Sequence, residues 1–160
     1  MSTPRLHVVL YQPEIPGNAG AVGRTCVAVG AKLWLVRPLG FRLTDRHLRR
    51  AGLDYWKSLD WQVVDGWDQL LEGLPDPTCK PWFLTKSAGS LYSDARFEPG
   101  DVLVFGSETQ GLPRSMLELH RDRCLRIPIR PEARSLNLAV SVAIVAFEAV
   151  RQLGPPPPPC

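Results

Sequence analysis

Short apolar runs recur along the chain and alternate with segments of helical periodicity. Six runs are predicted as strands, at residues 6–10, 33–36, 61–64, 81–85, 102–105 and 125–127. Segments 19–31, 67–74 and 113–120 carry helical spacing, and a short helix capped by Thr44 or Asp45 is expected to run to Arg50. Because parallel strands need crossover connections, this alternation predicts an α/β fold with a mainly parallel sheet flanked by helices.

The last predicted helix, at about residues 136–153, is apolar on nearly every side. Its first part reads LNLAVSVAIVAF, whereas a surface helix normally alternates apolar and polar faces. Two interpretations stay open. The helix is either a central core helix or a helix covered on its outer side by a second subunit.

The length and charge bound the class of protein. The chain has 160 residues, which favours one domain, here residues 1–154. Residues 155–160 are a proline-rich stretch that is expected to form a flexible tail. The formal net charge of +3 permits an anionic partner without requiring one.

Cysteines and histidines do not fall at the spacing of a structural zinc site, so no metal is expected. The four cysteines are Cys26, Cys79, Cys124 and Cys160, and no two form a C-x-x-C pair. The sequence begins without an apolar signal segment and has no apolar run long enough to span a membrane. These features predict a cytoplasmic protein with reduced thiols and no membrane contact.

Polar and turn-forming residues follow three of the predicted strands, where ligands of open parallel sheets usually bind. In the first stretch, Asn18 stands at a predicted helix start and Arg24 lies inside that helix. Asn18 is either a helix cap or a functional group. The Arg24 guanidinium either extends into solvent or binds an anion.

The second stretch, GSETQGLP, follows the strand at residues 102–105. Gly106 and Gly111 allow a close ligand approach or a positive φ, and Glu108 offers an acceptor. The alternative is a plain tight loop before a helix that begins at Pro113.

The third stretch, IPIRPEARSLNL, opens the apolar last helix. Ser135 is the expected N-cap of that helix, and Asn137 follows it. Arg130 and Arg134 lie beside them, so an anionic substrate is a reasonable expectation here.

Taken together and in order, these stretches resemble the SPOUT superfamily of S-adenosylmethionine-dependent RNA methyltransferases. The chain is most similar to the small single-domain branch that methylates the ribose 2′-hydroxyl of the tRNA wobble nucleotide, a cytidine or uridine. The matching segments run from Leu6 to Gly154 and read LYQPEIPGNAGAVGRT, GFRLTDRHLRRAGLDYW, VLVFGSETQGLP, IPIRPEARSLNL and FEAVRQLG.

The resemblance implies a C-terminal trefoil knot that holds S-adenosylmethionine. The residues that it implies for cofactor binding are Leu84, Gly106, Glu108, Gly111, Ile127, Ser135 and Leu136. Close relatives often carry Ser and Asn where this chain has Ala139 and Val140, which bears on the nucleotide preference and not on the reaction.

The resemblance also implies catalytic roles for Arg24, Asn18 and Asn137. A guanidinium is a poor base, so we expect Arg24 to clamp the neighbouring phosphate and stabilise the developing alkoxide. Asn18 and Asn137 would position the ribose or the cofactor.

RNA contacts are expected from basic and aromatic residues, because cations bind phosphates and aromatic rings stack on unpaired bases. A solvated helix face with core aromatics is the alternative for some of them. We expect a homodimer to hold the anticodon stem-loop, since so small a chain would need two subunits for this. The candidates are Arg42, Arg46, Arg49, Arg50, Tyr55, Arg130 and Arg134.

Two other functions compete with tRNA methylation. Longer relatives perform the same chemistry on ribosomal RNA, usually with an N-terminal RNA-binding extension, whereas this sequence reaches its first strand at Leu6. A catalytically idle RNA-binding module on the same fold is the other alternative, and a cofactor titration would separate it from both enzymes. A generic nucleotide-binding protein would need a phosphate loop or a dinucleotide fingerprint, which the sequence lacks.

Overall fold

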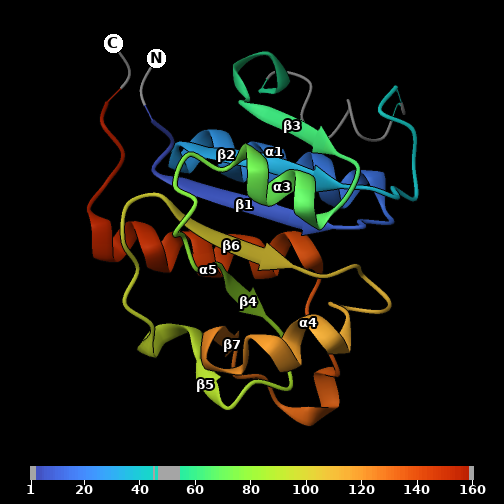
Figure 1. Cartoon of the computed structure of the whole chain (residues 1–160), viewed down its shortest axis with the longest axis vertical. Helices are drawn as coiled ribbons and strands as arrows, with labels where there is room; N and C mark the ends of the chain where they lie inside the picture. The colour runs from blue at the N-terminus through green and yellow to red at the C-terminus, as the bar shows by residue number, and fades with distance from the viewer. Residues whose placement is uncertain (1–2, 45, 47–54, 159–160) are drawn as a thin grey trace.

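The strands of the chain assemble into one parallel sheet (Figure 1). In the computed structural model, which describes residues 3–44, 46 and 55–158, seven strands follow the order β3-β2-β1-β6-β4-β7-β5. Every pair of neighbours among them is parallel. The bounds are β1 Leu6–Tyr11, β2 Ala31–Val36, β3 Trp61–Val64, β4 Trp82–Leu84, β5 Ser90–Leu91, β6 Asp101–Phe105 and β7 Cys124–Arg126.

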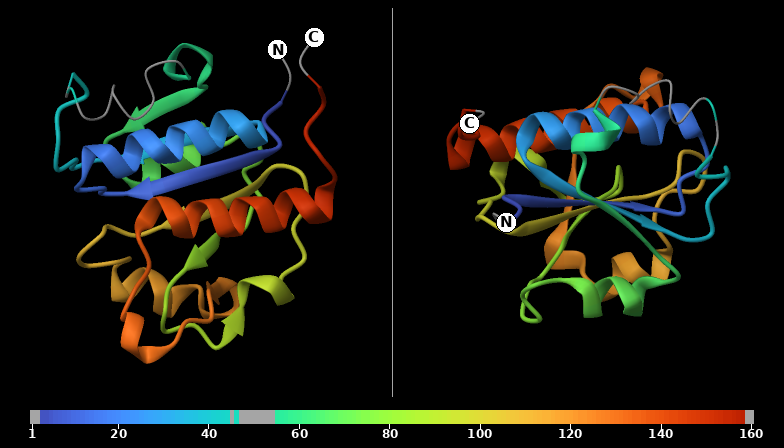
Figure 2. Two further views of the ribbon diagram at one scale, coloured as in Figure 1. Left: turned by 180° about the vertical axis from the view of Figure 1, so that it is seen from behind. Right: turned by 90° about the horizontal axis from the view of Figure 1, so that it is seen from above.

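Helices cover both faces of the sheet. The right-hand view of Figure 2 places α1 (Pro16–Val29) and α5 (Leu138–Leu153) on one face and α3 (Trp67–Gly73) and α4 (Arg114–Leu119) on the other. Short 3-10 turns lie at Trp56–Ser58, Tyr92–Asp94, Arg121–Arg123 and Pro131–Ala133. The predicted α/β fold with a mainly parallel sheet is confirmed.

The strand order changes direction between β1 and β6, which lie side by side. The chain leaves β1 into α1 on one face and leaves β6 into α4 on the other. The two following loops therefore diverge and leave a crevice at the carboxyl ends of these strands, as at the switch point of other open parallel sheets.

A hydrophobic core lies on each face of the sheet. Alternate residues of β1 pack into one core or the other, because successive side chains of a strand point to opposite faces. Leu6, Val8 and Leu10 face the core under α1 and α5, whereas Val9 faces the core under α3 and α4. All four are at most 1% exposed, which is typical of a strand buried on both faces.

Several predicted boundaries differ from the structure. The two-residue strand β5 carries no apolar run and was not predicted. β7 begins one residue earlier than expected, because Cys124 pairs with Phe83 of β4. Pro113 is the N-cap of α4 and not its first residue. The expected helix that ends at Arg50 lies largely outside the described residues.

The prediction of Ser135 as N-cap of the last helix is wrong. The cap is Asn137, whose Oδ1 accepts from the backbone N–H of Ala139 at 2.9 Å and of Val140 at 3.3 Å. Arg134 has a φ of 61°, and Ser135 N donates to Ala133 O, so a tight turn delays the helix until Leu138.

The reading of α5 as a fully covered core helix is also wrong for the single chain. Val142, Val145 and Ala149 are completely buried on its inner side. On its outer side Val140 is 47% exposed and Phe147 is 51% exposed. The interpretation that a second subunit covers the outer side stays a prediction. Within the described residues, no helix combines the length and apolarity that crossing a membrane requires.

Candidate functional site

A cavity of about 660 Å³ opens at the carboxyl ends of β6, β4 and β7. Its walls come from the loops that follow these strands, together with the starts of α1 and α5. Figure 1 shows these loops gathered around the carboxyl end of β6. The volume lies within the range of ligand pockets, about 300–1,000 Å³.

The structure brings nine of the predicted site residues together around this cavity. Seven are the predicted cofactor residues, and the other two are Asn18 and Asn137. Sequence reasoning missed further polar lining residues, although three of them directly follow β4. The missed polar residues include Thr85, Lys86, Ser87, Thr109, Gln110 and Ser141.

The glycines of the loop after β6 let the chain fold back on itself. A Cβ on Gly106 would overlap the backbone of Gly111 and Leu112. Gly111 has a φ of 66°, and Ser107 pairs with Gly111 in an antiparallel bridge. Both glycines are therefore needed for the shape of the cavity wall.

Glu108 is tied to the start of α1 and is not a free acceptor. Its carboxylate accepts from Glu14 N at 2.7 Å, from Ile15 N at 3.1 Å and from Asn18 Nδ2 at 3.3 Å. Ile15, the N-cap residue of α1, makes no side-chain cap bond. Glu108 thus pairs with backbone N–H groups immediately before α1, and its charge suits that end of the helix dipole.

Asn18 joins this contact to α5, so its interpretation as a helix cap is wrong. Asn18 lies in the first turn of α1, and its Oδ1 accepts from Asn137 Nδ2 at 3.0 Å. A chain of side chains, Glu108–Asn18–Asn137, therefore connects all three stretches that the sequence singled out.

Arg24 does not line the cavity of its own chain. Its side chain is exposed, and its guanidinium lies 4.8 Å from the ring centroid of Tyr55. Six residues along an α-helix correspond to a rotation of about 240° and a rise of about 9 Å, so Arg24 points away from Asn18. The structure thus separates Arg24 from the other two predicted catalytic residues.

The predicted RNA-contacting residues occupy two places. Arg42, Arg46 and Tyr55 are exposed, and Tyr55 lies against Arg24 of α1. Arg130 and Arg134 flank the short turn that leads into the cavity wall, where Arg130 pairs with Glu132 at 3.3 Å. Arg49 and Arg50 lie outside the described residues.

The three cysteine thiols that the structure describes do not offer a nucleophile at the cavity. Cys26, Cys79 and Cys124 are free, and none lines the cavity. Burial is the main cause that raises the pKa of all three thiols, so they stay protonated. Among the described residues no group of His, Cys, Asp and Glu side chains is arranged to hold a metal ion.

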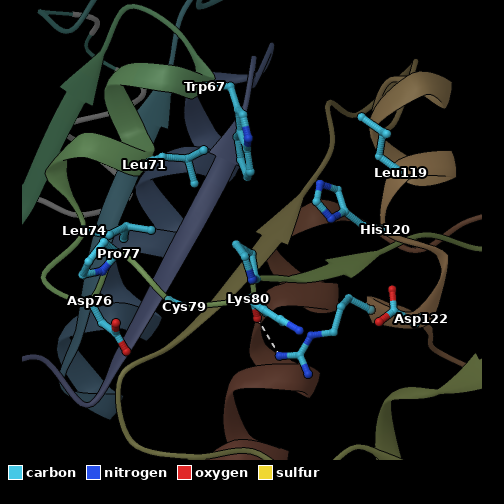
Figure 3. A pocket seen from close by; sticks show the side chains of 12 residues that line it. Trp67, Leu71, Leu74, Asp76, Pro77, Cys79, Lys80, Leu119, His120 and Asp122 are labelled. Atoms are coloured by element: carbon cyan, nitrogen blue, oxygen red, sulfur yellow. Dashed lines mark hydrogen bonds between the residues drawn. The ribbon is translucent and has the colours of Figure 1, made fainter.

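A second cavity of about 420 Å³ lies on the other face of the sheet, between α3 and α4 (Figure 3). Trp67 and Leu71 line one side of it, and His120 and Leu119 line the other. Its charged lining residues are balanced, with Lys80 and Arg123 against Asp76 and Asp122, so charge selects no class of ligand. None of the predicted site residues reaches it, and we assign the functional site to the larger cavity.

Comparison with known proteins agrees with this assignment. The sequence matches the SpoU rRNA methylase family over residues 5–147. This chain belongs to that family. The predicted resemblance to trefoil-knot RNA methyltransferases is thereby confirmed at the level of the family.

Individual relatives match over nearly the whole chain. A Burkholderia ambifaria protein named tRNA (cytidine(34)-2'-O)-methyltransferase is 47% identical to this chain. The match covers 96% of that protein and 92% of this chain. A structure described as "Structural insights into the 2-OH methylation of C/U34 on tRNA" is 48% identical with a TM-score of 0.87, covering 92% of this chain and 95% of that one.

A more distant relative is longer and contains a bound cofactor. The SpoU methyltransferase AviRb from Streptomyces viridochromogenes, in complex with AdoMet, has a TM-score of 0.83 at 25% identity. The match covers 96% of this chain but 62% of AviRb. Methyltransferase chemistry is thus the shared property of the family, whereas length and identity distinguish its branches.

Proposed function

We propose that this protein transfers a methyl group from S-adenosylmethionine to the ribose 2′-hydroxyl of the tRNA wobble nucleotide, a cytidine or uridine. The observation that carries this proposal is the 47% identity to the Burkholderia tRNA (cytidine(34)-2'-O)-methyltransferase over 96% of that protein's length. Methylation of ribosomal RNA is the alternative. It has less support, because a solved rRNA methyltransferase from Sinorhizobium meliloti is 26% identical and is matched over 58% of its length.

The residues around the larger cavity fit S-adenosylmethionine. Gly106 leaves room where a side chain would collide with backbone, and Leu84, Ile127 and Leu136 offer an apolar surface for the flat adenine ring. Ser135 and the loop N–H groups add hydrogen-bonding partners. When bound, the cofactor supplies an electrophilic methyl group on a sulfonium. Because Glu108 is tied to α1, its role is to hold the loop in place.

Asn18 and Asn137 would bind the ribose. Each side-chain amide has two N–H donors, and each uses one of them in the contacts described above. The remaining two donors can bind the 2′-oxygen and stabilise the negative charge that develops on it. This alignment of oxygen and methyl donor is the main contribution that such a site makes to the rate.

Arg24 would act in the cavity of a second subunit. It is exposed and directed away from its own cavity, near the outer surface of the α1 and α5 layer. That surface includes the outer side of α5, where Val140 is 47% exposed and Phe147 is 51% exposed. A homodimer formed through this surface would bury these side chains and complete each cavity with the partner's arginine. There the guanidinium would clamp a phosphate next to the target ribose.

The remaining assignments follow from this function. We expect the anticodon stem-loop to contact Arg42, Arg46 and Tyr55, with Arg49 and Arg50 from the segment outside the described residues. Arg130 and Arg134 would meet the RNA at the cavity rim. We further propose a single knotted domain over residues 1–154, a flexible tail over residues 155–160, a cytoplasmic location and no metal requirement.

A labelling experiment tests the function. The purified protein is incubated with methyl-labelled S-adenosylmethionine and either unmodified tRNA or ribosomal RNA, and the labelled nucleotide is mapped by nuclease digestion and mass spectrometry. We expect a 2′-O-methyl group at the wobble position, lost in Arg24→Ala and kept in Arg114→Ala, a matched exposed arginine on α4. Label on ribosomal RNA alone would contradict the tRNA assignment, and failure to bind the cofactor would contradict the enzyme assignment.

A further inference from the structure

A second carboxylate, that of Glu14, also holds the loop after β6, although no role was predicted for this residue from the sequence. Glu14, in the segment between β1 and α1, accepts through Oε1 from Thr109 Oγ1 at 2.6 Å and from Thr109 N at 3.2 Å. Thr109 lines the larger cavity, whereas Glu14 does not. These bonds to Thr109 also lower the pKa of Glu14, so its carboxylate is ionised at neutral pH.

The two loops exchange carboxylates. Glu108 of the β6 loop accepts from the backbone N–H of Glu14, and Glu14 accepts from the backbone N–H of the next residue, Thr109. Each carboxylate satisfies a donor of the opposite loop with a charge-assisted hydrogen bond. A third segment backs this contact, because Gly40 N donates to Pro13 O at 2.9 Å and a Cβ on Gly40 would overlap the backbone of Glu14.

Glu14 is the external anchor for the tip of the β6 loop. Beyond Thr109, the tip is held by Gln110 N donating to Ser107 Oγ and Gly111 N donating to Ser107 O. Both bonds lie inside the loop, so they preserve its shape without fixing its place. Glu108 anchors the loop one residue earlier.

We propose that Glu14 is a positioning residue for the methyl transfer, which acts through Thr109 to hold the Gly106–Gly111 loop where it receives the cofactor. The inference rests on the proposed function and deepens it. It couples cofactor binding to the start of α1, the helix that carries both Asn18 and Arg24.

The test compares cofactor affinity with folding stability in a set of variants. Isothermal titration with S-adenosylmethionine gives Kd, and thermal unfolding gives Tm, for Glu14→Ala, Glu14→Gln, Thr109→Val and the double variant Glu14→Ala/Thr109→Val. The matched control is Glu118→Ala, an exposed carboxylate on α4 that pairs with Arg114 at 3.1 Å.

We expect Glu14→Ala to weaken cofactor binding about 10-fold or more, the effect of losing charge-assisted bonds. Glu14→Gln, which keeps an acceptor oxygen, should recover part of the affinity, and the double variant should be no worse than Glu14→Ala, because both changes remove one contact. KM for the cofactor should rise with Kd. Glu118→Ala should match the wild type.

Four results decide the outcome. A Tm loss in Glu14→Ala with unchanged Kd would overturn the positioning role, as would additive effects in the double variant. If Glu14→Ala does not fold, Glu14→Gln and Thr109→Val decide, and wild-type affinity in both would overturn the inference. If the wild type itself binds no S-adenosylmethionine, the proposed function fails and this inference fails with it.

Discussion

The inner end and the outer face of the α1 and α5 layer are built in opposite ways. At the inner end, Asn18 and Asn137 bond to each other and to Glu108, and these polar contacts join three distant segments of the chain. On the outer face, Arg24, Val140 and Phe147 are exposed, and the Arg24 guanidinium lies over the ring of Tyr55. The difference supports our proposal that one chain forms its ligand cavity alone, whereas Arg24 and the apolar outer side of α5 serve a second subunit.

The largest effect is expected from a side chain added to the cavity wall in the loop after β6. Gly106→Ala places a Cβ against the backbone of Gly111 and Leu112, which cannot move aside as a flexible side chain could. We expect cofactor binding to fall below detection in a titration. Gly89→Ala is the control, since a Cβ there meets no atom within 4 Å, and it should bind as the wild type does. Normal binding by Gly106→Ala would show that the cofactor lies elsewhere.

Removing the outer arginine should leave the cavity intact and stop the chemistry. We expect Arg24→Ala to lower kcat by about 100- to 1,000-fold, the typical effect of losing one donor to a developing negative charge. Cofactor affinity should stay unchanged, because Arg24 does not line the cavity. Single-turnover rates and titration measure the two effects. Near-normal turnover by Arg24→Lys would refute a role that needs the two-pronged guanidinium.

A charge on the apolar outer face should separate the subunits. Phe147→Asp places a carboxylate where we propose a buried interface, so sedimentation velocity should show a monomer. Turnover should drop at least about 10-fold, since the partner's arginine is lost with the subunit. Leu119→Asp is the control, because Leu119 is 79% exposed on α4, away from this face. A monomeric wild type would contradict the proposed interface.

The smallest effect concerns the helix cap at the inner end. Asn137→Ala removes the cap of α5 and the bond to Asn18, with a cap loss of about 1 kcal/mol and a Tm decrease of about 2–4 °C. Ser135→Ala should leave Tm unchanged, because Ser135 does not cap the helix. The reverse order of the two Tm values, measured by calorimetry, would contradict the observed cap geometry.

Sequence patterns predicted the sheet and most of the cavity for a physical reason. Parallel strands buried on both faces must be short apolar runs, and ligands bind where such strands end. For this reason, the sequence pattern indicated Gly106 and Gly111 as site residues, whereas Ile127 was implied by the family resemblance.

The features that sequence reasoning missed depend on contacts between distant segments. Nothing local distinguishes Ser135 from Asn137 as a helix cap, because the turn at Arg134 decides it. Glu108 resembles a free acceptor in the sequence, but the fold brings it to α1. The direction of Arg24 depends on where α1 begins, and the β5 strand is defined only by its pairing with β7.

A subunit-mixing experiment tests most directly whether the site is completed across two chains. Arg24→Ala, with an intact cavity, is mixed with Gly106→Ala, with an intact arginine, after each is shown to be inactive alone. In a random mixture half of the dimers are mixed and each contains one complete site, so activity should return to about a quarter of the wild-type value. If Arg24 serves its own cavity, no site in any dimer is complete, and the mixture would stay inactive.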